Sequence, residues 1–151
     1  MTPATFLPVL RELATAYQAF EAYSAAHIRT LDLTPAQFDI IATLGNTAGM
    51  PLNELGAKTL ITKGTLTGVV DRLSDKQLVR RTASPSDGRS QIVQLTPQGE
   101  AMFARIFPAH LAHMQKAFAE LSADELVVME TSMRRLRETF AAALTRLDKA
   151  S

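Results

Sequence analysis

Hydrophobic residues recur at helical spacing along most of this chain, and they define the elements that we expect. Steps of three and four residues separate many of the apolar positions, which is the period of an amphipathic helix. Between two such stretches, residues 78–96 alternate apolar and polar positions, which predicts two short strands joined by a turn. The pattern and its helix-start signals predict helices near 3–29, 34–47, 52–58, 62–75, 97–120 and 122–148.

Several of these helix starts carry a capping residue. Thr34 precedes Pro35 and lies three residues before Gln37, which is the arrangement of a capping box with proline at the first helical position. The other candidate caps are Thr2 and Thr96, each followed by proline, Ser122 with Glu125 three residues later, and Thr62.

The two terminal helices carry long apolar stripes. In the last helix the stripe advances by alternating steps of three and four residues, a heptad-like pattern. Such stripes must be buried, either in an intramolecular helical core or against a second protomer, and we favour the second. The stripes are Phe6, Leu10, Leu13, Tyr17, Phe20 and Ser24 in the first helix, and Leu126, Met129, Met133, Leu136, Phe140, Ala143 and Leu147 in the last.

The middle of the chain has the pattern of a helix-turn-helix. A short helix at 52–58 and a brief turn lead to a second helix at 62–75, which in this motif lies in the major groove of DNA. The buried face of the second helix is expected to consist of Leu66, Val69, Val70 and Leu73.

The opposite face of helix 62–75 carries two glycines, Gly64 and Gly68. Each costs a helix roughly 1 kcal/mol relative to alanine, whereas the missing Cβ lets the backbone approach bases and phosphates. Gly64 alone could merely loosen the first turn, but the pair favours contact with a groove. The candidate DNA contacts of this helix are therefore Thr62, Lys63, Gly64, Thr65, Thr67, Gly68 and Arg72.

The hairpin at 78–96 has arginines at its base and tip. Arg81 lies at the base, and the turn contains Ser86, Asp87 and Arg89. We expect Asp87 to restrain the Arg89 side chain, and Arg89 to probe the minor groove or the DNA backbone. All four residues are candidate DNA contacts.

Charge is concentrated in the same region. The whole chain has a net charge of +1, but residues 56–96 hold seven basic and three acidic residues, while the remainder is net negative. An ordinary solvated face is the alternative, yet a basic centre between acidic ends is typical of a protein that binds double-stranded DNA.

Composition limits the other function classes. The chain has 151 residues, is 46% hydrophobic and contains no cysteine, so it can form a core without disulfides or thiol chemistry. We expect a cytoplasmic protein with no membrane span and no cofactor. Three scattered histidines provide neither a nucleophile–base pair nor a metal constellation, which argues against an enzyme.

Several short motifs occur in an ordered series between residues 33 and 99. They are Leu33-Thr34-Pro35-Ala36-Gln37-Phe38, Leu52-Asn53-Glu54-Leu55-Gly56, Val70-Asp71-Arg72-Leu73, Leu78-Val79-Arg80-Arg81, Pro85-Ser86-Asp87-Gly88-Arg89 and Val93-Gln94-Leu95-Thr96-Pro97-Gln98-Gly99. In this order and spacing the chain resembles the multiple-antibiotic-resistance-regulator (MarR) family of bacterial transcription factors. The resemblance implies a winged helix-turn-helix homodimer whose first, fifth and sixth helices form the interface. It also implies a wing arginine, here Arg89, in the minor groove.

The chain departs from the family pattern at two positions. Gln77 stands where the family usually has a helix-ending glycine, and Gly68 stands where many members have a side chain that can contact DNA. The resemblance also implies that a small ligand relieves repression. We expect a small phenolic or lipophilic effector, with Tyr17, His27 and Phe38 as candidate lining residues, and no metal site.

His110 and His113 lie within an apolar helix, where packing or interface roles are favoured over zinc binding. The predicted fold is mainly α with a small β-hairpin wing, with 33–96 binding DNA and 1–32 plus 97–151 forming the dimer. The predicted function is a homodimeric regulator, most simply a repressor, that binds a pseudo-palindromic operator. The alternative is a protein-interaction module on a winged-helix scaffold that does not bind DNA.

Overall fold

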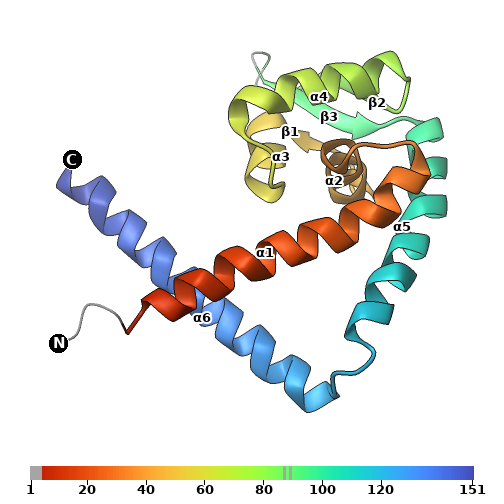
Figure 1. Ribbon diagram of the computed structural model, residues 1–151. Coiled ribbons are helices and arrows are strands. Elements are labelled where there is room, and N and C mark those ends of the chain that lie inside the picture. The colour runs from red at the N-terminus through yellow and green to blue at the C-terminus, as the bar shows by residue number, and fades with distance from the viewer. Residues whose placement is uncertain (1–4, 87, 89) are drawn as a thin grey trace. The chain divides into compact units, whose positions relative to one another are not determined.

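The computed structural model describes residues 5–86, 88 and 90–151, and it confirms a mainly helical fold with a small sheet (Figure 1). The helices are α1 (Leu7–Ile28), α2 (Pro35–Leu44), α3 (Leu52–Lys58), α4 (Lys63–Asp75), α5 (Pro97–Phe118) and α6 (Ala123–Ala150), with a 3-10 turn, η1 (Arg29–Leu31), after α1. The strands are β1 (Met50–Pro51), β2 (Val79–Ala83) and β3 (Gln91–Leu95).

The chain forms two compact units, Met1–Met114 and Gln115–Ser151. The first unit contains α1 to α4, the sheet and most of α5, and the second contains the end of α5 and all of α6. No described helix is both long and apolar enough to cross a membrane.

The core of the first unit is formed by one face of each of its helices together with the sheet. The predicted inner face of α4 is confirmed, because Leu66, Val69, Val70 and Leu73 are all buried. They pack with a larger apolar cluster that includes Ile40, Ile41, Leu44, Leu55, Val79, Val93 and Ile106.

The predicted hairpin is present, and a third strand extends it. β3 is the central strand of an antiparallel sheet with the order β1-β3-β2, in which Val79 pairs with Leu95 and Arg81 pairs with Val93. The third strand, β1, pairs Met50 with Val93 and was not predicted. It has only two residues and one is a proline, which a sheet tolerates at its edge.

Three of the predicted helix caps are confirmed by their hydrogen bonds. Thr34 Oγ1 accepts from the Gln37 amide at 3.1 Å while Gln37 Oε1 accepts from the Thr34 amide at 3.1 Å. Ser122 forms the same reciprocal box with Glu125. Thr96 Oγ1 accepts from the Gly99 amide at 3.0 Å, so it caps the start of α5.

Two predicted starts need correction. Thr62 is the N-cap residue of α4, but its hydroxyl makes no capping bond and instead donates to Thr65 Oγ1 at 2.9 Å. Thr2 lies outside the described residues, and α1 begins at Leu7 rather than near residue 3. Phe6 is its N-cap residue and offers no side-chain acceptor.

The turn between α4 and β2 uses a left-handed residue. Gln77 has φ 63°, a conformation that glycine adopts with little strain. The Gln77 carbonyl accepts from Thr96 Oγ1 at 2.6 Å, and the Leu78 carbonyl accepts from the Thr96 amide at 3.0 Å. These bonds tie the turn to the start of α5 and fix the position of the wing below α4.

Candidate nucleic-acid interface

α4 buries one face and leaves the other face open to solvent. The candidate DNA contacts of this helix and its cap, Thr62, Lys63, Gly64, Thr65, Thr67, Gly68 and Arg72, are all exposed. A Cβ built on either glycine would meet nothing within 4 Å. The glycines therefore have no packing role in this chain, which leaves the exposed backbone of α4 free for a partner.

The N-terminus of α4 is also open. The first N–H groups of the helix receive no side-chain cap, and the Thr62 hydroxyl donates to Thr65 Oγ1 instead. Unpaired N–H groups and the positive end of the helix dipole together attract anions such as phosphate. Lys63 adds a cation at the same end of the helix.

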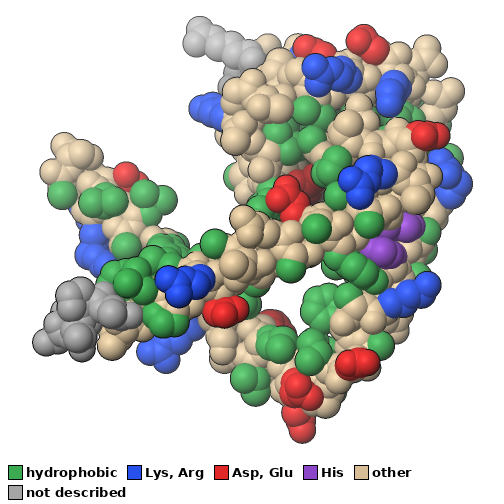
Figure 2. Space-filling model, in the orientation of Figure 1, with side chains coloured by type: hydrophobic (Ala, Val, Ile, Leu, Met, Phe, Trp, Pro, Cys, Tyr) green, Lys and Arg blue, Asp and Glu red, His purple; other side chains and the backbone are tan. Residues whose placement is uncertain are grey.

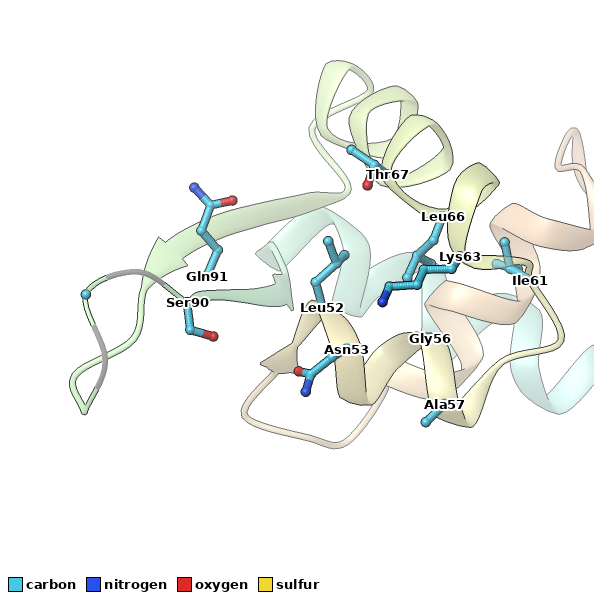
Figure 3. A pocket seen from close by; sticks show the side chains of 11 residues that line it. Leu52, Asn53, Gly56, Ala57, Ile61, Lys63, Leu66, Thr67, Ser90 and Gln91 are labelled. Atoms are coloured by element: carbon cyan, nitrogen blue, oxygen red, sulfur yellow. The ribbon is translucent and has the colours of Figure 1, made fainter. Parts of the chain in front are cut away.

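A hollow of about 870 Å³ lies between α3, α4 and the wing. Figure 3 shows Lys63 and Thr67 on the α4 side and Ser90 and Gln91 on the wing side, with the Lys63 side chain extending from α4 toward α3. Asn53 reaches the rim from α3. A cationic side chain and neutral hydrogen-bonding side chains from three elements thus line one hollow.

Arg81 joins the wing to α4. Its Nη2 atom donates to Asp71 Oδ1 at 2.5 Å and to the Thr67 carbonyl at 3.4 Å. Asp71 is therefore paired with a cation, which keeps a carboxylate on the recognition face from standing alone. Arg81, a candidate DNA contact, has one edge of its guanidinium engaged in this structural pair.

The wing tip is described only in part. Ser84 Oγ lies 3.2 Å from Ser86 Oγ and accepts from the Ser86 amide at 3.4 Å, so the candidate contact Ser86 is held in a local turn. Asp87 and Arg89 lie outside the described residues. Their predicted interaction and the predicted placement of Arg89 stay predictions.

A second cavity, of about 610 Å³, lies behind the start of α4. Its walls come from α1, α2, the turn before α4, and α5 within the first unit. Tyr17 and Phe38, which we expected to line an effector site, both line it, whereas His27 is not among its lining residues. Thr62 and Thr65 lie at its edge, so the cavity reaches the start of the recognition helix.

Asp39 is the lining residue whose role the sequence did not reveal. Its Oδ2 atom accepts from the Leu60 amide at 2.9 Å, across 21 positions of sequence. Burial raises the pKa of the Asp39 carboxyl above its usual value, and the hydrogen bond from Leu60 opposes that rise. A lone acidic position inside an apolar helix was the only available signal.

The three histidines cluster where α1 crosses α5 (Figure 2). His27 Nδ1 lies 2.9 Å from His110 Nδ1, and His110 Nε2 lies 3.2 Å from Ser24 Oγ. His113 Nε2 lies 2.8 Å from the Tyr23 carbonyl, and its ring stacks on Tyr23 with centroids 4.0 Å apart. These contacts are those of packing histidines.

His110 is buried between these groups. Burial lowers the pKa of His110, and the neighbouring His27 and His113 lower it further. Within residues 5–86, 88 and 90–151, no group of three or more His, Cys, Asp or Glu side chains could hold a metal ion.

Comparison with known proteins gives a consistent family. A family model described as MarR family matches residues 31–90. The HTH-type transcriptional regulator MhqR of Bacillus subtilis is 32% identical over 82% of this chain and 86% of its own. MhqR is a transcriptional regulator rather than an enzyme, and the match lends no support to an interaction module that does not bind DNA.

Two solved structures share the fold at higher coverage. Bordetella bronchiseptica BpsR, whose DNA binding is regulated by 6-hydroxynicotinic acid, is 28% identical with a TM-score of 0.75, over 91% of this chain and 96% of its own. A MarR mutant from E. coli complexed with operator DNA is 26% identical with a TM-score of 0.77, over 90% of this chain and 98% of its own.

Proposed function

The chain belongs to the MarR family of transcriptional regulators, and from that premise we propose that it is a homodimeric repressor that binds a pseudo-palindromic operator. The observation that carries the proposal is the exposed face of α4, where two glycines with open space above them lie among threonines and Lys63. The operator complex of the E. coli relative supports DNA as the partner.

Each α4 would enter a major groove, with its N-terminal half against the bases. Successive major grooves on one side of DNA are separated by roughly 34 Å, so the two copies of α4 in a dimer would have that spacing. In this proposal residues 33–96 bind DNA, and residues 1–32 and 97–151 form the dimer interface.

The wing would supply a second contact. We assign Arg81, Ser86, Asp87 and Arg89 to it, with Arg89 reaching the minor groove or the backbone. Fluorescence anisotropy with DNA from upstream of the gene tests this assignment. Arg89→Ala should weaken binding at least tenfold, and an unchanged affinity would remove the wing from the interface.

Phosphate contacts should make binding depend strongly on salt. If a dimer neutralises 6–10 phosphates, the logarithm of the affinity falls against the logarithm of the salt concentration with a slope of roughly −5 to −9. A complex that is insensitive to salt would point to a protein partner instead.

The dimer would bury apolar side chains that each unit leaves exposed. α6 has no buried residue, and Met133 and Phe140 of its stripe are 55% and 48% exposed. Exposed apolar area of this extent marks an interaction surface. Met133→Arg should therefore shift the protein from dimer to monomer in analytical ultracentrifugation.

A control for that variant lies on the same helix. Thr131→Arg adds the same charge about 160° round the helix axis, away from the stripe, and should leave the dimer intact. Equal dissociation by both variants would reflect general charge repulsion, and a Met133→Arg protein that stays dimeric would contradict the assigned surface.

A small molecule would release the operator. The cavity that contains Tyr17 and Phe38 extends to Thr62, so an occupant contacts both the proposed dimerisation region and the start of α4. The regulation of BpsR by a small aromatic compound supports an effector of that size. A compound screen that reads operator release by anisotropy would identify it.

A further inference from the structure

The cavity behind α4 has aromatic walls. Tyr17 and Phe20 come from α1 and Phe38 comes from α2. The Tyr17 and Phe20 ring centroids lie 6.2 Å apart with their planes tilted by 43°. Tilted rings that share a cavity can contact a planar ligand, and their faces attract an organic cation.

The same walls carry two carboxylates and neither a lysine nor an arginine. Glu21 lines the cavity from α1 and Asp39 lines it from α2. His110 also lines it, but burial and its histidine neighbours lower its pKa and favour the uncharged ring. Burial raises the pKa of Asp39, whereas Glu21 is exposed, so the charged side chains that line the cavity are carboxylates alone.

Neither carboxylate is neutralised from within the described part of the chain. The ion pairs there join Glu54 to Lys58, Asp71 to Arg81 and Glu130 to Arg134, all away from this cavity. Asp39 is half-buried, and its one hydrogen-bond donor is the uncharged Leu60 amide. A half-buried carboxylate without a cation is stabilised by any cation that enters its site.

We propose that this cavity binds an aromatic ligand with a protonated amine and discriminates against aromatic carboxylates. The ring would contact Tyr17, Phe20 and Phe38, and the ammonium group would bind near Asp39 and Glu21. An aromatic acid would instead place a second negative charge beside these carboxylates. The inference deepens the proposed function, because it rests on this cavity as the effector site.

The proposed position of the ammonium group, beside Asp39, links ligand binding to the segment that leads into α4. Asp39 holds the Leu60 amide, two residues before the N-cap of α4. An ammonium ion that binds Asp39 Oδ2 competes with that amide for the same oxygen. The turn that positions α4 is thereby altered when the ligand binds.

Three probes with the same ring and the same two-carbon linker test the charge preference. Tyramine carries an ammonium group, tyrosol a neutral hydroxyl, and 3-(4-hydroxyphenyl)propanoate a carboxylate. In isothermal titration calorimetry with the full chain at neutral pH and no DNA, tyramine should bind at least tenfold more tightly than the acid, with tyrosol between them. Raising the salt concentration should lower the affinity for tyramine and leave the affinity for tyrosol unchanged.

Charge-neutral variants locate the preference. Asp39→Asn keeps the size of the side chain, and Glu21→Gln changes an exposed residue whose loss does not endanger folding. Each should reduce the tyramine preference at least threefold. Glu12→Gln removes the same charge from α1 outside the cavity lining and should have no effect.

The proposal is overturned if the acid binds as tightly as tyramine, if tyramine fails to bind at millimolar concentration, or if Glu12→Gln reduces the preference as much as Glu21→Gln does. Operator affinity is measured separately by anisotropy. A protein that binds DNA but prefers the acid refutes the ligand class alone. One that binds tyramine but no DNA refutes the proposed function.

Discussion

Gly68→Ala should stabilise the protein and weaken its binding to DNA. The Cβ of an alanine here would meet nothing within 4 Å, so the substitution creates no clash within the chain. Gly68 lies in the interior of α4, where replacing glycine with alanine stabilises a helix by about 1 kcal/mol. For a chain of this size that gain raises the melting temperature by about 2–4 °C.

The effect on DNA has the opposite sign. If α4 lies in the groove at van der Waals distance, a methyl group on the Gly68 face forces the helix away from the bases in both half-sites. We expect at least a tenfold loss of operator affinity, which is about 1.4 kcal/mol for the dimer. Divided over the two half-sites, this loss is smaller than the free energy of one bidentate base contact, so a weakened contact in each half-site would account for it.

Thermal denaturation and fluorescence anisotropy, performed on the same preparation, measure the two effects. Ser74→Ala is the matched control: it also raises the helix propensity of α4, but it lies about 120° round the axis from Gly68. It should raise the melting temperature and leave operator affinity unchanged. A Gly68→Ala protein that is more stable and binds the operator normally would refute groove contact at this face.

Three further predictions concern the turn after α4, the ion pair and the histidine cluster. Gln77→Gly should stabilise the protein by about 0.5 kcal/mol in urea denaturation, because relief of left-handed strain outweighs the added entropy of the unfolded chain, whereas Gln77→Ala should not. Asp71→Asn should change stability by less than about 1 kcal/mol because the Asp71 side of its pair with Arg81 is exposed. The freed guanidinium should steepen the salt slope of DNA binding by about 0.9 per phosphate gained, and an unchanged slope would mean that Arg81 does not contact phosphate. The pKa of His110 is lowered in the folded state, so the unfolded state binds more protons as the pH falls. The stability that is present above pH 6.5 should therefore be lost as the pH falls from there through the folded pKa. His110→Gln should flatten this pH dependence when denaturation is measured at about pH 7.5 and about pH 5.5.

Local signals allowed most of the fold to be predicted from the sequence. The capping boxes at Thr34 and Ser122 and the apolar stripe of α4 act over a few residues, so each can be recognised without knowledge of the rest of the chain. β1 could not be recognised in this way. Met50 and Pro51 become a strand only because β3 lies beside them, and β3 follows some forty residues later in the chain.

The candidate site could likewise be predicted only where a local sequence pattern determines it. The exposed face of α4 follows from its helical period, and the structure leaves Gly64 and Gly68 open as expected. The Asp39 contact with Leu60 joins residues 21 positions apart, and no local pattern encodes it. Thr62 shows the converse: its position predicts a cap, but its hydroxyl donates to Thr65 Oγ1 and accepts from no backbone amide of the helix start.

The segment from Leu60 to Thr65 meets the demands of both proposed ligands. Its amide at Leu60 is held by a carboxylate of the cavity, and its uncapped helix start presents N–H groups suited to a phosphate. Since one segment cannot adopt a ligand-bound and a DNA-bound arrangement independently, the two binding events must be coupled. Coupling of binding free energies is reciprocal, so operator DNA should weaken effector affinity by the same factor by which the effector weakens operator affinity. Asp39→Asn should reduce both factors together, whereas a ligand that merely competed for the DNA surface would keep its effect in that variant.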